Sequence, residues 1–423
     1  MASRRYVIIG GSAAGLAAAQ AVRELDRDGS ITVLSAEPDP PYYRPMIPFI
    51  VTGQKTAEGI GMMGQGPYTA RGIEVRQNAR VTAVDPRARA VTVNDQESVP
   101  YDRLLIATGS RPYIPPTIQG VDTPGVYAPR TLADARSMAQ RVSHARRAVL
   151  AGGGMVNLKF AFALLERGVS VTMVVTSPEI LSQVMEMDAA ALIREALERA
   201  GLEILTGRNV VQILSGPGGV EGVLLDTGEE IPCQIVCIGK GVRPNVEFLS
   251  GSSILVDGGV VADVDTACFF GQEKERLPEV FTAGDVAVTF DPITGQRMMT
   301  ALWTNAVEMG RCAGRNMAGQ PTLYTGTFGI LNATQVAGVP FVSMGIVHTA
   351  GTPYETHVVR TANTYRKLVF SEDGKRLIGA VFVGDIHHAG LYRYLIRERV
   401  PLDGLKAAAI RHQLHYGHLL RIK

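Results

Sequence analysis

The chain has 423 residues, a length typical of about three domains. Apolar residues make up 46% and charged residues 19%, which suits a folded protein with a large core and excludes an intrinsically disordered chain. The 42 basic and 40 acidic residues nearly balance, so general binding to nucleic acid is not expected. Four cysteines are too few for a disulfide scaffold. The most apolar stretch, 148–176, is interrupted by three charged residues, so we expect no membrane span and a cytoplasmic location.

Two segments, roughly 140 residues apart, share a pattern of apolar strand, glycine-rich turn and apolar helix. The first runs over 6–25 and the second over 148–167. A further apolar strand follows each of them, at 31–34 and 169–175. Strand, glycine turn, helix and second strand together form a dinucleotide-binding unit. The sequence therefore predicts an α/β fold with two Rossmann-like units in one chain.

Apolar strands that end in glycine turns, and two linkers that contain proline, indicate the domain boundaries. The linkers are expected at 112–116 and 242–245. From about Thr327 the pattern changes to alternating strands, followed by a helix from about Ala389. We predict an outer dinucleotide-binding domain, a second one inserted in it, and a C-terminal α+β interface or dimerisation domain. Their residues are 1–113 with 245–326, 114–244, and 327–423.

The first glycine turn, Gly10-Gly11-Ser12-Ala13-Ala14-Gly15, is suited to a pyrophosphate because it places backbone N–H groups and a helix N-terminus together. Ser12 occupies the position of a usual second glycine, and its side chain is small enough to allow close approach. Glu37 follows the second strand, where a carboxylate can accept hydrogen bonds from both ribose hydroxyls. Alone, this pattern also fits an ordinary strand–helix turn.

Two further strands end in glycine turns, at Ala107-Thr108-Gly109 and at Thr282-Ala283-Gly284-Asp285. Asp285 can accept a hydrogen bond from a ribityl hydroxyl, and it can equally be the N-cap of a helix. We expect that helix to begin at Val286 and to direct its positive end at flavin oxygens or phosphate. The three elements in this order favour a flavin site.

These motifs resemble the FAD-containing, pyridine-nucleotide-dependent oxidoreductases over nearly the whole chain. The resemblance is greatest to rubredoxin and ferredoxin reductases and to the flavin part of NAD(P)H-dependent nitrite reductase, whose third domain is similar to residues 383–392 and 401–406. It implies that Trp303 lies beside the isoalloxazine ring, although the only tryptophan can equally be a core residue. The residues that the resemblance implies for FAD are Gly10, Ser12, Ala13, Ala14, Glu37, Arg44, Pro45, Val81, Ala107, Thr108, Gly109, Gly284 and Asp285.

The second glycine turn, Gly152-Gly153-Gly154-Met155-Val156-Asn157, departs from the usual pattern. Asn157 replaces the third glycine, whose missing side chain normally lets helix and strand pack closely. We therefore expect weaker binding of the nicotinamide dinucleotide. The residues expected to contact it are Gly152, Gly154, Met155, Val156 and Gly239.

Lys159 occupies a position at which the family usually has a glutamate near the nicotinamide and flavin N5. In the electron-transfer reductases that glutamate pairs with a lysine of the first domain, and the matching position here is Phe49. The resemblance thus implies a catalytic role for Lys159 beside the flavin. A solvated helix residue is the alternative.

The second strand of the inserted domain ends in Val175-Thr176-Ser177. This segment offers neither a carboxylate for a ribose 2′-hydroxyl nor an arginine for a 2′-phosphate. Because no cation lies nearby, we expect FAD and NAD as cofactors, and NADP is not excluded.

The cysteines indicate how electrons leave the flavin. Related disulfide reductases carry a redox cysteine or cysteine pair in the first domain, but residues 42–49 contain none. Cys233 and Cys237 belong to an apolar strand and are expected in the core, and Cys268 and Cys312 are isolated. Without a thiol relay, electrons must pass to or come from an external partner.

The C-terminal segment, 387–423, carries seven basic and two acidic residues and five of the eight histidines. His412, His415 and His418 have no acidic or cysteine companion, so we expect no metal site. A basic surface can dock an acidic iron–sulfur protein or partner subunit, or it can simply be a solvated tail.

We therefore predict an FAD-dependent enzyme that transfers hydride between NAD(P)(H) and flavin and exchanges electrons with an iron–sulfur protein or subunit. The second turn also resembles that of flavin subunits of tungsten-dependent aldehyde oxidoreductase complexes, which reduce NAD. A stand-alone NADH oxidase and a non-catalytic FAD-bound assembly module are the alternatives.

Overall fold

The computed structural model describes residues 3–62, 65–271, 273–291, 295–326 and 331–419. By Cα packing, the chain divides into two compact units. Unit 1 collects residues 1–47, 55–111 and 242–327, and unit 2 collects residues 48–54, 112–241 and 328–423. The predicted inserted and C-terminal domains thus fall in one unit, which also takes up residues 48–54.

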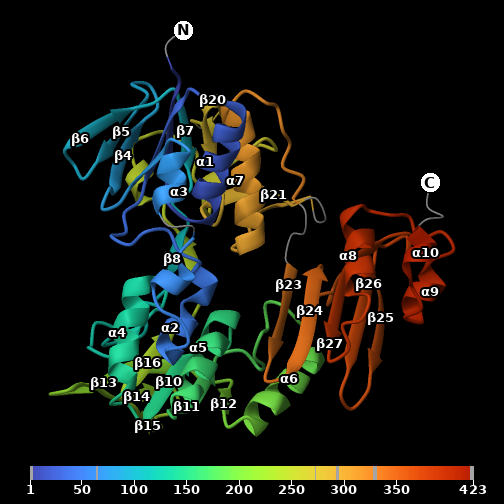
Figure 1. Ribbon diagram of the computed structural model, residues 1–423. Coiled ribbons are helices and arrows are strands. Elements are labelled where there is room, and N and C mark those ends of the chain that lie inside the picture. Colours follow the sequence, from blue (N-terminus) through green and yellow to red (C-terminus); the bar gives the residue numbers. More distant parts are fainter. Residues whose placement is uncertain (1–2, 63–64, 272, 292–294, 327–330, 420–423) are drawn as a thin grey trace. The chain divides into compact units, whose positions relative to one another are not determined.

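Unit 1 is built on a six-stranded sheet with the order β19-β20-β7-β1-β2-β3 (Figure 1). All neighbouring strands are parallel except β19 and β20. The central strands are almost entirely apolar, as expected for parallel strands covered on both faces. The strands are β1 (Arg5–Ile9), β2 (Ser30–Leu34), β3 (Ile73–Arg76), β7 (Arg103–Ile106), β19 (Ala267–Phe270) and β20 (Glu275–Thr282).

Helices α1 (Ala13–Leu25) and α7 (Trp303–Met317) pack side by side in unit 1 (Figure 1). Small residues permit this close approach. A Cβ added to Gly310 would lie 2.2 Å from the Ala14 carbonyl oxygen, and one added to Gly314 would lie 2.4 Å from the Ala18 carbonyl oxygen. The alanine-rich sequence of α1 is therefore a packing surface for a neighbouring helix.

Two smaller sheets complete the strands of unit 1, and short helical segments lie between its strands. One sheet is the antiparallel meander β4-β5-β6, and the other has the order β18-β21-β22, with two of its strands after Asp285. The elements are η1 (Arg44–Met46), η2 (Glu58–Ile60), α3 (Gln65–Ala70), β4 (Val81–Asp85), β5 (Ala90–Val93), β6 (Glu97–Pro100), η3 (Glu247–Leu249), β18 (Val260–Val261), β21 (Ala287–Phe290) and β22 (Arg297–Met299).

The helix expected to begin at Val286 is absent, and that prediction is wrong. Strand β21 follows Asp285 directly and pairs with β18 and β22. Its β-branched and aromatic residues favour a strand over a helix. The next helix, α7, begins only at Trp303.

The five-stranded sheet of unit 2 repeats the strand order of unit 1. Its order is β12-β11-β10-β16-β9, and every neighbouring pair is parallel. An antiparallel three-stranded meander again stands between the third and fourth strands of the repeat. This topology confirms the predicted pair of Rossmann-like units. The strands are β9 (Val126–Tyr127), β10 (Arg147–Ala151), β11 (Ser170–Val175), β12 (Glu203–Thr206), β13 (Val210–Gly216), β14 (Gly219–Leu225), β15 (Glu230–Pro232) and β16 (Ile235–Ile238).

Helices α2 (Pro48–Thr52), α4 (Leu132–Val142), α5 (Met155–Glu166) and α6 (Met187–Arg199) belong to unit 2. Helix α2 packs against α4 and α5, which explains why residues 48–54 group with this unit. The two connections between the units pair with each other as β8 (Ser110–Pro112) and β17 (Val242–Pro244).

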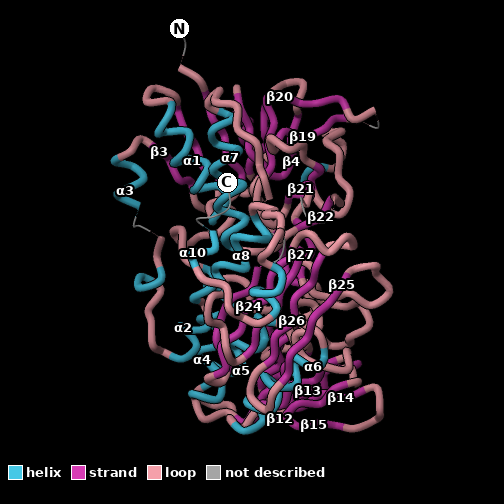
Figure 2. Tube along the Cα trace, turned by 90° about the vertical axis from the view of Figure 1, so that its right-hand side faces the viewer, coloured by secondary structure: helices cyan, strands magenta, loops and turns pink. Residues whose placement is uncertain are grey.

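The C-terminal part of unit 2 is an antiparallel sheet with the order β23-β24-β27-β26-β25, and helix α8 packs against it (Figure 2). Buried Lys367 of β26 donates hydrogen bonds to Glu186, at the start of α6, and to the carbonyl of Val347. This contact ties the sheet to α6. The elements are β23 (Leu331–Val336), β24 (Val339–Gly345), β25 (Glu355–Arg360), β26 (Tyr365–Phe370), β27 (Leu377–Val383), α8 (Ala389–Arg397), α9 (Lys406–Ile410) and α10 (Tyr416–Leu419).

Among the described residues, no helix is both long enough and apolar enough to cross a membrane.

Candidate dinucleotide sites

The turn after β1 requires glycine at two of its positions. Gly10 has φ of +117°, and a Cβ there would lie 2.1 Å from the carbonyl oxygen of Ala107, just beyond the end of β7. A Cβ on Gly15 would lie 1.9 Å from the Gly10 carbonyl oxygen. Both positions therefore exclude a side chain, and the start of α1 is held directly against the ends of β1 and β7.

The N-terminus of α1 is open to an anion. Its first turn, which includes the buried Ala13 and Ala14, has no acidic residue, and the N-cap Ser12 makes no side-chain capping bond. Unpaired N–H groups at a helix N-terminus carry partial positive charge and bind phosphate. The Ser12 hydroxyl instead accepts a hydrogen bond from Arg44 Nε at 3.3 Å. Arg44 thus adds a cation beside the turn.

Glu37 and Arg44 form an ion pair beside this turn. The other Glu37 oxygen accepts a hydrogen bond of 2.6 Å from the Tyr42 hydroxyl. Burial would lower the pKa of Arg44, but the Tyr42 and Glu37 oxygens outweigh it and raise that pKa, with a smaller contribution from Asp285. The predicted residues Ser12, Glu37, Arg44 and Asp285 therefore interact with one another at the first glycine turn of unit 1. Tyr42 was not singled out from the sequence.

The glycine turns after β7 and β20 are also brought to α1. A Cβ on Gly284, which has φ of +83°, would lie 3.0 Å from Ala14 Cβ. Asp285 Oδ2 accepts a hydrogen bond of 2.9 Å from Ser110 Oγ. Asn245 donates through Nδ2 to the Thr108 carbonyl at 3.0 Å. Asn245 also donates through its backbone N–H to the carbonyl of Gly109, and sequence reasoning found neither Ser110 nor Asn245.

For three further residues predicted to contact FAD, the structure gives less support than for those at the glycine turns. Trp303 is partly buried at the first position of α7, and its ring centroid lies 5.8 Å from that of Tyr43. Pro45 is exposed in η1. Val81, at the start of β4, is buried in the core with Ile9, so its side chain has a packing role.

The second turn repeats the geometry of the first at its leading position. Gly152 has φ of +115°, and a Cβ there would lie 2.3 Å from the Gly239 carbonyl oxygen, just beyond β16. Around Gly154, the N-cap of α5, a Cβ would meet no atom within 4 Å. Helix α5 begins at Met155 and carries no acidic residue in its first turn, and Val156 is 51% exposed. An accessible, uncapped helix N-terminus is thus present here too.

Asn157 is fully buried and fastens α5 to the strand ends. Its Nδ2 donates to the carbonyls of Ala151 at 3.0 Å and Gly152 at 2.8 Å. A Cβ on Gly239 would lie 2.4 Å from Asn157 Oδ1, so the asparagine fits because residue 239 is glycine. Asn157 Oδ1 itself has no hydrogen-bond partner among the described residues. The expected disturbance of helix packing is therefore absorbed locally.

Lys159 is exposed on α5, two residues after Asn157. Desolvation by the surrounding protein lowers its pKa. Phe49, the position expected to match its family partner, is 39% exposed in α2, and α2 packs against α5. Phe49 thus lies on a helix that packs against the helix of Lys159.

A cation does lie at the end of β11, and the expectation that none is nearby is wrong. Lys240 directly follows Gly239, and its Nζ donates to Thr176 Oγ1 at 2.6 Å and to Asn209 Oδ1 at 3.4 Å. Lys240 lies on a different strand connection from Thr176, so the strand end itself gave no signal of it.

All four cysteines are unpaired and buried. Burial raises the pKa of the Cys233, Cys237 and Cys312 thiols to about 12, and it also raises that of Cys268. A buried thiol with a raised pKa is a poor nucleophile, because only the thiolate reacts.

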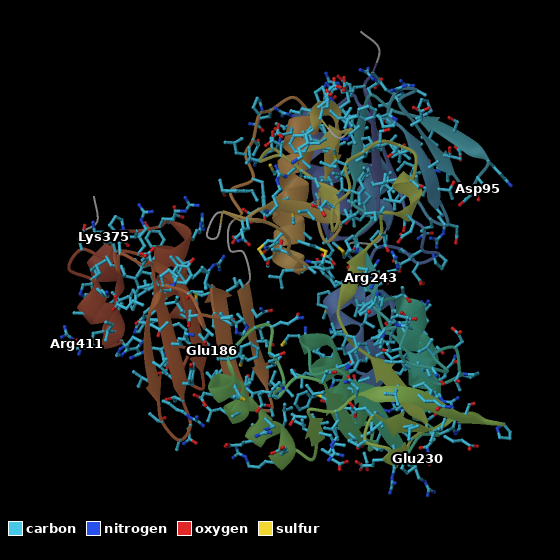
Figure 3. The ribbon with its side chains drawn as sticks, turned by 180° about the vertical axis from the view of Figure 1, so that it is seen from behind. Asp95, Glu186, Glu230, Arg243, Lys375 and Arg411 are labelled. Carbon is cyan, nitrogen blue, oxygen red and sulfur yellow. The ribbon has the colours of Figure 1, made fainter. Side chains whose placement is uncertain are left out.

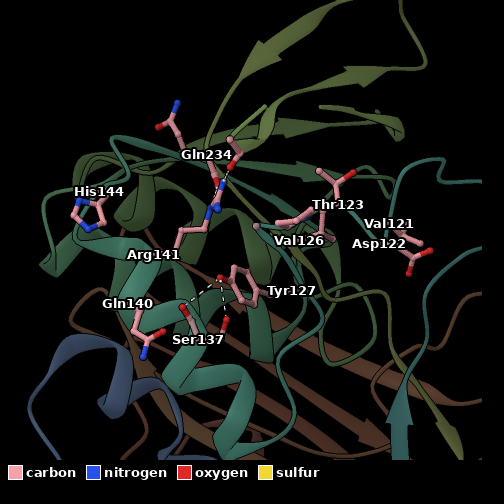
Figure 4. Close-up of a pocket in the computed structure, with 13 residues that line it drawn as sticks. Val121, Asp122, Thr123, Val126, Tyr127, Ser137, Gln140, Arg141, His144 and Gln234 are labelled. Carbon is pink, nitrogen blue, oxygen red and sulfur yellow. Dashed lines mark hydrogen bonds between the residues drawn. The ribbon is translucent and has the colours of Figure 1, made fainter. Parts of the chain in front are cut away.

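The open hollow drawn in Figure 4 is not one of these sites. It lies between β9, α4 and the β13–β14 turn, beside Gln234 at the amino end of β16. Arg141 spans it and donates to the carbonyls of Gln234 at 2.8 Å and Gly218 at 3.1 Å. Its guanidinium thus serves backbone acceptors. Within the described ranges no group of three or more His, Cys, Asp or Glu side chains could hold a metal.

Both turns fit a dinucleotide pyrophosphate by their own geometry: glycine is required at the leading position, and an uncapped helix N-terminus follows. The comparisons with known proteins agree. Residues 4–310 match the family model for pyridine nucleotide-disulphide oxidoreductases, and residues 331–400 match that for the rubredoxin NAD+ reductase C-terminal domain.

Relatives cover most or nearly all of the chain. The epsilon subunit of NADH-dependent phenylglyoxylate dehydrogenase from Aromatoleum evansii is 29% identical, over 98% of this chain and 96% of the relative. A probable ferredoxin reductase from Castellaniella defragrans is 30% identical, over 80% of this chain and 83% of the relative. The reductase in the covalent putidaredoxin reductase–putidaredoxin complex has the same fold, with a TM-score of 0.86, 22% identity and 98% of each chain covered. The chain belongs to the pyridine nucleotide-disulphide oxidoreductase family and is an FAD- and NAD(P)H-dependent oxidoreductase.

Proposed function

We propose that the chain carries electrons between NAD(P)H and an iron–sulfur protein or subunit through FAD held in unit 1. The observation that carries this proposal is the state of the cysteines: all four are buried, and each has a raised thiol pKa. The family description names disulphide oxidoreductases, which pass electrons through cysteine thiols. This chain offers no reactive cysteine for such a relay. Electrons that reach the flavin must leave to an external acceptor.

Each group of residues in unit 1 has a distinct task in this proposal. The turn at Gly10 and the start of α1 bind the pyrophosphate. Glu37 accepts from the ribose, which requires that its hydrogen bonds to Arg44 and Tyr42 be exchanged for ribose hydroxyls. Asp285 accepts from the ribityl chain while Ser110 fixes its carboxylate. Bound FAD supplies the hydride and single-electron chemistry.

In unit 2, the turn at Gly152 and the start of α5 bind the pyrophosphate of the nicotinamide dinucleotide. Met155, Val156 and Gly239 border it, and Lys159 acts near the nicotinamide. Trp303 of unit 1 covers the isoalloxazine ring. These roles follow from motif positions, with the contacts above as support.

The names of similar proteins support an iron–sulfur partner. A probable ferredoxin reductase, the partner in the putidaredoxin complex and the rubredoxin-reductase type of C-terminal domain all favour a small electron-transfer protein. The relative that is a dehydrogenase subunit favours a larger complex. We include in this proposal an assembly with a tungsten-dependent aldehyde oxidoreductase. A cytoplasmic location is also part of the proposal, because unpaired cysteines suit a reducing compartment.

The C-terminal segment 387–423 is proposed as the docking surface, although part of its charge is neutralised. Arg397 pairs with Glu398, and Lys406 pairs with Glu355. Arg411 is exposed and projects from the C-terminal part in Figure 3. Its Nε donates to Gln413 Oε1 at 3.1 Å. Arg421 and Lys423, also expected to contribute, lie outside the described residues.

Truncation after Asp403 would be a poor test of docking. Leu405, Ala409 and Leu414 are buried, and the Tyr392 hydroxyl donates to the Ala409 carbonyl at 2.9 Å. Removal of this segment would therefore open the core of the C-terminal part. Charge reversal at an exposed arginine leaves the core intact.

The test uses the flavin-loaded protein under anaerobic conditions, with NADH or NADPH as donor. The acceptors are a rubredoxin, a [2Fe–2S] ferredoxin and a small dye. We expect rapid transfer to at least one iron–sulfur protein, and Arg411→Glu should lower it severalfold at low salt without changing dye reduction. Arg27→Glu is the matched control, since Arg27 is exposed in unit 1 and does not belong to the C-terminal part.

Other outcomes would contradict the proposal. Reoxidation by oxygen alone, with no response to either iron–sulfur protein, would assign a stand-alone oxidase. Failure of both NADH and NADPH to bleach the flavin would assign an assembly module. Capture of the chain with a tungsten enzyme from native cells would test the larger complex.

A further inference from the structure

Lys240 reaches across the carboxyl edge of the second sheet. It follows β16, whereas its hydrogen-bond partner Thr176 follows β11, and β10 lies between these two strands. Neighbouring strands are about 4.8 Å apart, so β16 and β11 lie roughly 10 Å apart, and the side chains of Lys240 and Thr176 together bridge the ends of these strands. The end of β10 leads into the turn at Gly152. The Lys240 ammonium is therefore placed beside the edge where the nicotinamide dinucleotide would bind.

The groups around the ammonium are neutral oxygens. Lys240 Nζ donates to Thr176 Oγ1 at 2.6 Å and to Asn209 Oδ1 at 3.4 Å, and Thr176 Oγ1 donates to the same Asn209 oxygen. Lys240 takes part in no ion pair within the described part of the chain. By contrast, Arg208 pairs with Glu229 close by.

The residues at the end of β11 do not oppose a phosphate. A carboxylate at this point of a dinucleotide-binding unit accepts a hydrogen bond from the ribose 2′-hydroxyl and repels a 2′-phosphate. Here Val175 is buried and apolar, and Thr176 and Ser177 are uncharged. A hydroxyl and an ammonium therefore stand where a carboxylate would select the 2′-hydroxyl.

Among the described residues, the half-buried ammonium is only partly compensated by an anion. Desolvation lowers the pKa of Lys240, and the charge of Asp226 opposes this only in part. Asp226 Oδ1 is engaged at 3.1 Å by the backbone N–H of Asn209. Burial of a cation without a paired anion is unfavourable, so an anionic ligand at this point would be stabilising.

We propose that Lys240, with Thr176 and Asn209, binds the 2′-phosphate of NADP(H), so that the enzyme prefers NADP(H) to NAD(H). This inference rests on the proposed function, since it takes the turn at Gly152 to bind the nicotinamide dinucleotide. Lys240 is then the residue that determines cofactor specificity, supplied by the end of β16 in place of the usual residue at the end of β11.

Equilibrium binding to the flavin-loaded protein tests this without turnover. Titration calorimetry would compare NADP+ with NAD+, and adenosine 2′,5′-bisphosphate with AMP. We expect the 2′-phosphorylated member of each pair to bind at least about tenfold more tightly. Lys240→Met should weaken binding of NADP+ by about 10- to 100-fold, the usual range for a lost hydrogen bond to a charged group, and change NAD+ binding by less than about twofold.

Two variants accompany this substitution. Lys240→Arg keeps the cation and should retain the preference for NADP+. Lys375→Met removes one positive charge from an exposed position far along the chain and should change neither affinity. Unchanged flavin content and melting temperature verify that each variant is folded.

The outcomes separate this inference from the proposed function. Wild-type protein that binds NAD+ as tightly as NADP+ would overturn the inference and leave the proposed function standing. An equal loss of both dinucleotides in Lys240→Met would also overturn it, since Lys240 would then contact a group common to both. Wild-type protein that binds neither dinucleotide would contradict the proposed function itself. If Lys240→Met does not fold, Thr176→Val is the second variant, and an unchanged preference there would count against the subsite.

Discussion

The turns that begin at Gly10 and at Gly152 share their leading geometry and differ at the sixth position. Both leading glycines have positive φ, +117° and +115°, and both face a carbonyl oxygen at the end of the neighbouring strand. At the sixth position, unit 1 has Gly15, where any side chain would clash with the Gly10 carbonyl, whereas unit 2 has the buried Asn157. The first position is thus fixed by the backbone, while the sixth can be occupied if its side chain makes its own hydrogen bonds.

The residue at the end of the neighbouring strand also differs between the two units, together with the residue at the sixth position of the turn. Unit 1 combines Gly15 with Ala107, and unit 2 combines Asn157 with Gly239. Because Asn157 Oδ1 would lie 2.4 Å from a Cβ at 239, the larger residue on the helix requires the smaller one on the strand. Close packing of helix on strand is therefore a property of the pair of residues, and a departure from the glycine pattern in one turn does not by itself indicate a lost site.

The largest effect is expected from alanine at the two leading glycines. Gly10→Ala places a Cβ 2.1 Å from a backbone oxygen at a positive φ, so FAD content should fall from near one per chain to almost none. Gly152→Ala has the same clash at 2.3 Å but should spare FAD and abolish its reduction by NAD(P)H. Visible spectra of the purified proteins and anaerobic titration with NADH and NADPH measure both effects. Gly218→Ala, in the β13–β14 turn and with no atom within 4 Å of the added Cβ, is the matched control.

The pairing of Asn157 with Gly239 is tested by a double-mutant cycle. Gly239→Ala should destabilise the protein by about 1–3 kcal/mol, the usual cost of overpacking a core. Asn157→Gly removes the two hydrogen bonds to the Ala151 and Gly152 carbonyls and should cost a similar amount. The double variant should be more stable than the sum of the two single effects predicts, because the clash is gone.

Denaturant unfolding gives the free energies, and Ala107→Gly in unit 1 is the comparison without an opposing side chain. Strict additivity of Gly239→Ala and Asn157→Gly would mean that the two residues adjust independently. The explanation that Asn157 fits the second turn because residue 239 is glycine would then be wrong.

The strands and the repeat could be predicted from the sequence because their signals are local. An apolar run, a glycine at a fixed distance and an apolar helix lie within about 25 residues of one another in both units. The wrong helix at Val286 had a local signal as well: the segment Val286–Phe290 is β-branched and aromatic, and the motif position of Asp285 outweighed it. Local propensity was the better guide there.

Side-chain pairs between distant segments could not be predicted in this way. Lys240 and Thr176 are 64 residues apart in the chain, and they meet because β16 and β11 are both neighbours of β10 in the sheet. Ser110 and Asp285 are 175 residues apart, and Asn245 meets Thr108 across 137 residues. The motif supplied one member of each pair, and only the sheet topology supplied the other.

Lys159 is the residue of the second turn region for which we expect a moderate effect. Its pKa is lowered by desolvation, and no acidic side chain contributes to that shift. A cation near the nicotinamide can stabilise negative charge on the reduced cofactor. Lys159→Met should slow reduction of the bound flavin about tenfold with FAD content unchanged, and stopped-flow absorbance measures this rate. Unchanged kinetics would return Lys159 to the solvated face of α5.

The smallest effect is expected from removal of the cysteines, of which each dinucleotide unit contains two. Cys233 and Cys237 lie in or next to β16 of the second sheet, while Cys268 and Cys312 lie in β19 and α7 of unit 1. All are buried, and a raised pKa keeps each thiol protonated at neutral pH. A variant with alanine at all four positions should therefore transfer electrons from NAD(P)H to a dye within about twofold of wild type. Its stability should fall because small cavities form in both cores.

The two cysteine pairs can be removed separately, which turns this prediction back on the comparison between the units. Loss of turnover only when Cys268 and Cys312 are replaced, in folded protein with full flavin content, would place a redox thiol in the FAD-binding unit. The same loss with Cys233 and Cys237 would place it next to the nicotinamide turn. Either result would contradict an external acceptor as the sole exit for electrons. Equal, small losses of stability in both double variants, with turnover kept, would mean that the thiols serve both sheets only by filling space.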